Sequence, residues 1–190
     1  AVEPLVSSPM PEWAMHWSWD GKYLVYPGLD GKTSNDIWYL SLTGEQQPVA
    51  IIQSEFNEVD PVLSPDGRYL AYSSNASGQR EIYVTSFPTG EGLWQVSVSG
   101  GVAPAWQGNE IFYVRNNALM AVKVATSPTF RPGTPEQLFT EESARAILDN
   151  GYDVTRDGQR FVVVQTIEVG GSGEPVMTVV QDWAEEFEGN

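Results

Sequence analysis

The sequence predicts an all-β fold built from repeated antiparallel sheets, and three observations support this prediction. The stretch Leu63–Tyr72 reads as a strand, a tight Ser-Pro-Asp-Gly turn and a second strand with alternating polar and apolar residues. The same pattern recurs at 17–26 and 154–163, and a shortened copy occupies 106–113. The chain is also rich in strand-favouring aromatic residues and in turn residues, with 7 Trp, 8 Tyr, 18 Gly and 13 Pro.

The copies follow a period close to 45 residues. Asp20 lies 46 residues before Asp66, and Asp157 follows Asp66 by 91 residues, which is two periods. A repeat of about 40–45 residues with four strands has the size of a propeller blade. Because a single small sheet cannot bury both of its faces, neighbouring repeats must cover them. The sequence therefore predicts a β-propeller domain over 1–190, with four blades near 12–52, 60–98, 102–140 and 151–181.

Each repeat is expected to contain the same strands in the same order. In the first repeat, a polar loop from Pro27 to Lys32 should follow the second strand. The expected strands are 13–17, 22–26, 36–40 and 47–52 in the first repeat; 61–63, 69–72, 81–84 and 94–96 in the second; 105–106, 110–114, 119–124 and 137–139 in the third; and 152–154, 161–165 and 176–180 in the fourth.

The fourth repeat lacks a fourth strand, whereas an orphan strand at 3–7 precedes the first repeat. That strand could complete the last blade and close a ring of four. The alternative is that these four blades belong to a larger ring of six to eight, and we favour it because four blades is the low limit of known propellers. An incomplete ring would leave sheet faces open and could associate with a second copy of the chain as a homo-oligomer.

The negative net charge of the chain limits the classes of partner that it can bind. With 25 acidic and 10 basic residues, the formal net charge is −15, which argues against nucleic acid and anionic membrane surfaces. The charge either serves solubility alone or attracts a cationic ligand. No apolar run reaches 18 residues, so we expect no membrane insertion. The absence of Cys excludes disulfides and thiolate metal sites.

The second repeat, Leu63–Tyr72 followed by Glu81–Val84, resembles the WD40-like PD40 repeat of the TolB propeller family. The other three repeats depart from that pattern. Trp19 and Arg156 stand where the family has Pro in the first and fourth repeats, and the third repeat has lost the Pro-Asp pair. The last repeat and Val179–Trp183 also resemble the end of bacterial PD40 propellers that follow a kinase domain or a membrane helix. The resemblance implies binding or scaffolding of proteins or peptides, no cofactor, and a periplasmic or other extracytoplasmic location, with a cytoplasmic one left open.

Nothing in the sequence indicates a catalytic residue or a metal site. His16 is the only histidine, so a metal site built on several imidazoles is excluded, and no nucleophile motif accompanies it. We expect His16 to be a packed strand residue. The Asp-Gly turns lack the repeated acidic pattern and distal Glu of a calcium loop.

Three acidic residues are the main candidates for a binding site. Glu12, Asp60 and Asp153 each precede the first strand of a repeat or lie near its start, and in a propeller that strand lines the central channel. They could form a carboxylate ring around the channel mouth for a cation or a Lys- or Arg-bearing peptide; alternatively, they cap turns and face water. Trp19 is the best candidate for an exposed aromatic contact, whereas Trp17 and its counterpart Trp106 are expected in the core.

Three functions remain open from the sequence. The first is a non-catalytic propeller that binds a protein or peptide at one channel mouth, using Glu12, His16, Trp19, Asp60 and Asp153. The second is a sensor or regulatory domain of a longer Ser/Thr kinase or peptidase. The third is a propeller that binds a glycan or a cation.

Overall fold

The computed structural model of the chain describes residues 16–29, 32–140, 152–169 and 172–181, and none of these residues lies in a helix. The prediction of an all-β fold is confirmed. No described segment is therefore a helix long and apolar enough to cross a membrane. Glu12 and the orphan strand predicted at 3–7 lie outside the described residues.

Within the described residues, the strands form four antiparallel sheets that follow one another along the chain. The second sheet has the simple order β5-β6-β7-β8, and in the third sheet β13 pairs with β11. The strands are β1 His16–Trp17, β2 Tyr23–Leu29, β3 Asn35–Ser41 and β4 Pro48–Ile52; β5 Glu58–Leu63, β6 Tyr69–Ser74, β7 Glu81–Ser86 and β8 Trp94–Gln95; β9 Val102–Gln107, β10 Glu110–Arg115, β11 Ala118–Ala125, β12 Arg131–Pro132 and β13 Glu136–Thr140; and β14 Tyr152–Val154, β15 Arg160–Val169 and β16 Ser172–Gln181.

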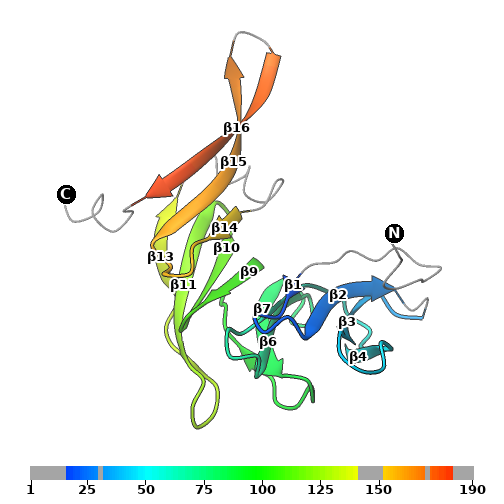
Figure 1. Ribbon diagram of the computed structural model, residues 1–190. Helices are drawn as coiled ribbons and strands as arrows, with labels where there is room; N and C mark the ends of the chain where they lie inside the picture. Colours follow the sequence, from blue (N-terminus) through cyan, green and yellow to red (C-terminus); the bar gives the residue numbers. More distant parts are fainter. Residues whose placement is uncertain (1–15, 30–31, 141–151, 170–171, 182–190) are drawn as a thin grey trace.

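The first strands of the four sheets connect the sheets to one another. Strand β5 contacts β1 on one side and β9 on the other, and β14 contacts β9. Figure 1 shows the sheets succeeding each other in chain order, with the outer part of the β15–β16 hairpin extending away from the others. The first strand of each sheet therefore lies on the inside of the arrangement, and the later strands lie further out.

Three apolar clusters fill the spaces between neighbouring sheets. Val25 and Ile37 of the first sheet pack with Leu63 and Leu70 of the second. The other two clusters contain Ile82, Val84, Trp106, Ile111 and Phe130 between the second and third sheets, and Phe112, Leu119, Val154 and Phe161 between the third and fourth. Each sheet thus buries its apolar faces against its neighbours, as the repeat pattern requires.

A side-chain hydroxyl organises the turn after the first strand. The Ser64 hydroxyl donates to Asp66 Oδ1 at 2.7 Å and accepts the N–H groups of Arg68 at 3.2 Å and Tyr69 at 3.0 Å. Gly67 completes the turn at a positive φ of 69°, which a residue without a side chain adopts at little cost. Ser18 and Thr155 form the corresponding contacts in the first and fourth sheets.

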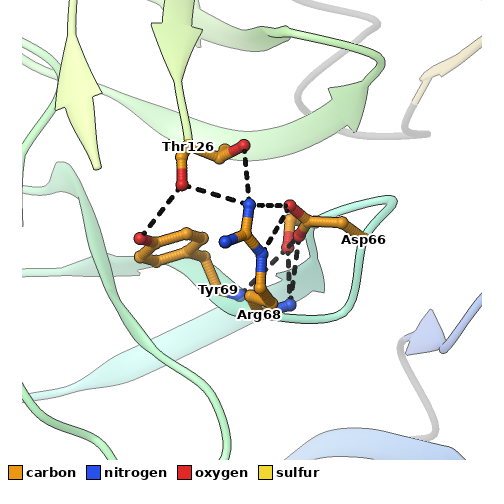
Figure 2. Close-up of polar contacts among 5 residues, drawn as sticks. Asp66, Arg68, Tyr69 and Thr126 are labelled. Carbon is orange, nitrogen blue, oxygen red and sulfur yellow. Dashed lines mark hydrogen bonds and ion pairs between the residues drawn. The ribbon is translucent and has the colours of Figure 1, made fainter. Parts of the chain in front are cut away.

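Next to this turn, Arg68 links the second sheet to the third. Its guanidinium pairs with Asp66 Oδ2 at 2.8 Å, and Nη2 donates to the carbonyl of Thr126 at 3.1 Å and to its hydroxyl at 3.2 Å. Thr126 follows β11, so these bonds cross from one sheet to the next. Figure 2 shows Arg68 between Asp66 and Thr126, with the Tyr69 hydroxyl directed at the same Thr126 carbonyl.

Two sequence predictions about the first sheet are wrong. The predicted loop from Pro27 instead continues β2 through Gly28 to Leu29, because β3 is long enough to pair with it and Gly28 leaves room for the Trp38 ring. Trp17 was expected in the core, yet 61% of it is exposed. Its counterparts pack against the preceding sheet, and no described sheet precedes β1.

Candidate functional site

The first strands of the second and third sheets contain the same backbone irregularity. Asp60 has φ of 56° and Ala103 has φ of 51°, values that are uncommon for residues with a side chain. Both residues lie three positions before equivalent buried residues, Leu63 and Trp106, and the strand register shifts at both places. Such bulges redirect side chains and often occur at functional sites.

The two bulges are joined by hydrogen bonds. Asp60 Oδ2 accepts the Ser73 hydroxyl at 3.2 Å and the N–H of Ala103 at 3.4 Å. From the fourth sheet, the Tyr152 hydroxyl donates to the carbonyl oxygen of Ala103 at 2.9 Å. The backbone of Ala103 therefore connects a carboxylate of the second sheet to a phenol of the fourth.

His16 joins the first sheet to the same region. The N–H of Leu63 donates to His16 Nδ1 at 3.3 Å, so this nitrogen acts as an acceptor. Burial lowers the pKa of His16, and the nearby negative charge of Asp153 partly opposes that decrease. A neutral imidazole suits this bond, because a protonated Nδ1 could not accept it.

Negative charge gathers around Tyr152. Burial is the main cause that raises the pKa of the Tyr152 hydroxyl, and the carboxylates of Asp153 and Asp60 raise it further. Asp153 is the next residue of β14, and Asp60 is linked to Tyr152 through the backbone of Ala103. Asp153 is exposed, whereas Asp60 is partly buried. We call His16, Asp60, Ala103, Tyr152 and Asp153 the axial cluster.

The structure thus brings three of the five predicted site residues into one region. His16, Asp60 and Asp153 belong to the axial cluster, while Glu12 lies outside the described residues. Trp19 lies in the turn beyond the end of β1, 40% exposed, with the Arg156 guanidinium 4.5 Å from its ring centre.

The two carboxylates do not occupy equivalent positions of the repeat. Counting back from the matched residues Leu63 and Val154, Asp153 corresponds to Val62 rather than to Asp60. Sequence reasoning also missed Tyr152 and Ala103. The neighbouring Asp153 could have drawn attention to Tyr152, but no sequence signal marks an alanine with positive φ.

The axial cluster is suited to binding cations and hydrogen-bond donors. It combines two carboxylates, a histidine nitrogen and a phenol, and none of them carries a positive charge when His16 is neutral. Among the described contacts, His16 Nδ1 is taken by a backbone N–H rather than by a hydroxyl or a carboxylate, which differs from a nucleophilic triad. Within the described residues, no three His, Asp or Glu side chains converge as a metal site.

No protein-family model matches the chain, and no curated protein sequence matches it either. Solved structures do match. TolB from Acinetobacter baumannii superposes with a TM-score of 0.66 at 18% identity, over 94% of this chain and 43% of that one. The chain has a TolB-type β-propeller-like fold. The expected likeness to TolB is thereby confirmed at the level of the fold.

Other structures share this TolB-like fold. A puromycin hydrolase S511A mutant matches with a TM-score of 0.63 at 14% identity, over 94% of this chain and 28% of that one. An oligogalacturonate lyase in complex with manganese matches with a TM-score of 0.59 at 10% identity, over 93% of this chain and 66% of that one. The chain spans less than half the length of the Acinetobacter TolB and of the puromycin hydrolase.

Proposed function

We propose that this TolB-like propeller domain is a non-catalytic binding module that takes a basic segment of a protein or peptide at the axial cluster. The observation that supports the proposal is that Asp60 and Tyr152, from two different sheets, both bond the backbone of Ala103, with Asp153 next to Tyr152 in β14. The net charge of −15 adds a long-range attraction for a cationic partner.

Asp153, Asp60 and His16 of the axial cluster would have different roles in binding. Asp153 is exposed and would meet a Lys or Arg side chain first. Asp60 is held by Ser73 and Ala103, so its position is fixed before a partner arrives, which lowers the entropic cost of binding. A neutral His16 adds no repulsion for a cation.

Binding of a short Lys- and Arg-rich peptide, measured by calorimetry at low and physiological salt, tests this proposal. The double variant Asp60→Asn, Asp153→Asn removes both charges, and Asn tolerates the positive φ of residue 60. We expect binding to weaken at least about tenfold, since each charged hydrogen bond contributes on the order of 1.5–3 kcal/mol.

The matched control is Glu45→Gln, Glu91→Gln, which removes the same charge from exposed positions away from the axial cluster. This control should bind nearly as tightly as the unmodified chain. Equal weakening in both double variants would show that net charge alone attracts the peptide, and the proposed site would be wrong.

A second candidate is a sensor or regulatory propeller of a longer peptidase. The likeness to puromycin hydrolase favours it, because 94% of this chain matches only 28% of that protein. Sequencing the reading frame on both sides of the chain tests this candidate, and a hydrolase or kinase domain in the same frame would support it. We also propose an extracytoplasmic location, based on the TolB-like fold, which cell fractionation would test.

A further inference from the structure

A pocket lies between the first and second sheets, and none of its lining residues belongs to the axial cluster, although Glu58 precedes Asp60 by two residues in β5. Its volume is about 240 Å³. Ile52 comes from the first sheet, and Phe56 comes from the segment that leads into the second. The remaining lining residues are Ser54, Glu58, Tyr72, Ser74, Ala76, Tyr83 and Leu93.

Glu58 in this pocket is a buried carboxylate with one oxygen unsatisfied. The residue is 2% exposed, and its Oε1 accepts the hydroxyls of Ser54 at 2.8 Å and Ser74 at 3.0 Å. Glu58 Oε2 has no hydrogen-bond partner among the residues that the structure describes. Leaving a charged oxygen buried without a partner is costly, so Glu58 needs an explanation that the fold alone does not supply.

The other buried carboxylates of these two sheets differ in this respect. Glu81 accepts Gln79 Nε2 at 2.7 Å and the N–H of Gly100 at 2.8 Å on one oxygen, and the Ser97 hydroxyl on the other. Asp36 accepts the Thr33 hydroxyl at 2.6 Å and the N–H of Ser54 at 3.3 Å on its two oxygens. Those two carboxylates accept hydrogen bonds on both oxygens, whereas Glu58 accepts them on Oε1 alone.

Charge at the pocket favours a cation as the missing partner. Burial raises the pKa of Glu58, and the negative charge of Asp36 contributes in the same direction. Ser54 connects the two acids, since its hydroxyl donates to Glu58 and its backbone N–H to Asp36. Without a ligand, both effects favour the protonated carboxyl of Glu58. A bound cation that paired with Oε2 would instead favour the carboxylate and offset its repulsion from Asp36.

The rest of the lining limits the size and character of the ligand. Phe56, Tyr72 and Tyr83 supply aromatic rings, and Ile52 and Leu93 supply aliphatic surface. The polar lining residues Ser54, Glu58 and Ser74 are bonded to one another and so form a single polar site. At about 30 Å³ per water-sized group, the volume admits roughly eight such groups.

We propose that this pocket binds a small primary amine with a compact aromatic or aliphatic body, whose ammonium group pairs with Glu58 Oε2. The aromatic walls would enclose the apolar body and also attract the cation through their ring faces. This site is separate from the axial cluster, so it does not depend on the proposed peptide-binding function.

Calorimetric titration of the unmodified chain with phenethylamine tests the proposal, and 2-phenylethanol serves as a neutral ligand of the same shape. We expect the amine to bind at least about tenfold more tightly than the alcohol, because only the amine forms a charge-assisted bond to Glu58. Glu58→Gln should remove this preference, since Gln keeps the volume and still accepts the Ser54 and Ser74 hydroxyls. Glu55→Gln, an exposed acid nearby, is the control and should leave the preference unchanged.

Three results would overturn the proposal. They are the absence of amine binding to the unmodified chain, equal affinity for amine and alcohol, and an unchanged preference in a folded Glu58→Gln variant. N-acetyl-lysine amide provides a further comparison. Tighter binding of that compound than of phenethylamine would assign the pocket to a lysine side chain of a partner and would reject a small free amine.

Discussion

Trp19 of the first repeat and Arg156 of the fourth are in direct contact, with the guanidinium carbon of Arg156 4.5 Å from the centre of the Trp19 ring. Both residues occupy the position that Pro65 holds in the second repeat. These two turns keep the Asp-Gly pair of the repeat but lack its proline, and their contact brings the first and fourth sheets together at this end of the inner strands. Loss of the repeat's proline coincides here with a cation–π contact between sheets.

This contact should be measurable as a coupling energy. We expect Trp19→Ala and Arg156→Ala to show a coupling of about 0.5–1 kcal/mol in a double-mutant cycle, the range for cation–π pairs near a surface. Denaturant unfolding of the four proteins provides the measurement. The pair Trp19→Ala and Arg131→Ala, whose residues lie in the first and third sheets, should be additive; equal coupling in both cycles would show that Trp19 and Arg156 do not interact specifically.

Ser64 should contribute more to the free energy of unfolding than an exposed loop serine such as Ser77. Ser64→Ala removes the hydroxyl that accepts the Tyr69 N–H, removes the bond to Asp66 and leaves the Arg68 N–H with Asp66 Oδ1 as its acceptor. Because Ser64 is only 1% exposed, water cannot easily replace these bonds, and we expect a loss of about 1–3 kcal/mol in the free energy of unfolding. Ser77→Ala is the control, since that exposed hydroxyl makes one bond, to the carbonyl of Gln79.

The repeated hydroxyl shows what the sequence could and could not predict. Period, strand order and turn positions follow from local patterns, so the all-β fold was predictable from Asp-Gly spacing and alternation. The sequence marks a Ser-Pro-Asp-Gly turn, but it does not show that the Ser64 hydroxyl bonds Asp66 and the N–H groups of Arg68 and Tyr69. A serine that accepts two backbone N–H groups looks the same in a sequence as any other loop serine.

The axial cluster was only partly predictable for a related reason. Asp60 and Asp153 were recognisable as acids near the first strands, but the link from Asp60 through Ala103 to Tyr152 depends on backbone bulges and on how sheets pack, neither of which local patterns encode. Trp17 illustrates the same limit. Its repeat position predicts a core residue, yet its burial depends on whether a neighbouring sheet covers it.

Arg68 provides a test of contacts between the second and third sheets. Arg68→Lys keeps the charge but loses the planar fork that reaches both Asp66 and Thr126. Since Arg68 is exposed to solvent, we expect a decrease in Tm smaller than that of Ser64→Ala. Lys22→Arg, in the equivalent turn of the first sheet, is the control and should change Tm little; a loss for Arg68→Lys as large as that for Ser64→Ala would contradict this ranking.

His16 should make stability depend on pH in a specific window. Burial lowers its pKa in the folded chain below the ordinary 6.5, so the unfolded chain takes up the proton first as the pH falls. The contribution of His16 is therefore complete above pH 6.5 and is lost as the pH falls below that value towards the folded pKa. The loss amounts to about 1.4 kcal/mol for each unit by which the pKa is lowered.

Comparison of the unmodified chain with His16→Gln isolates this effect, because His16 is the only histidine. Glu58 acts in the opposite direction, since its raised pKa lets the folded chain take up a proton first, but it is present in both proteins and cancels. We expect the difference in unfolding free energy between the two proteins to rise from pH 5 to about 6.5 and then to level off. A difference that stays constant over this range would mean that the pKa of His16 is not lowered in the folded chain and that the Leu63 N–H does not donate to Nδ1.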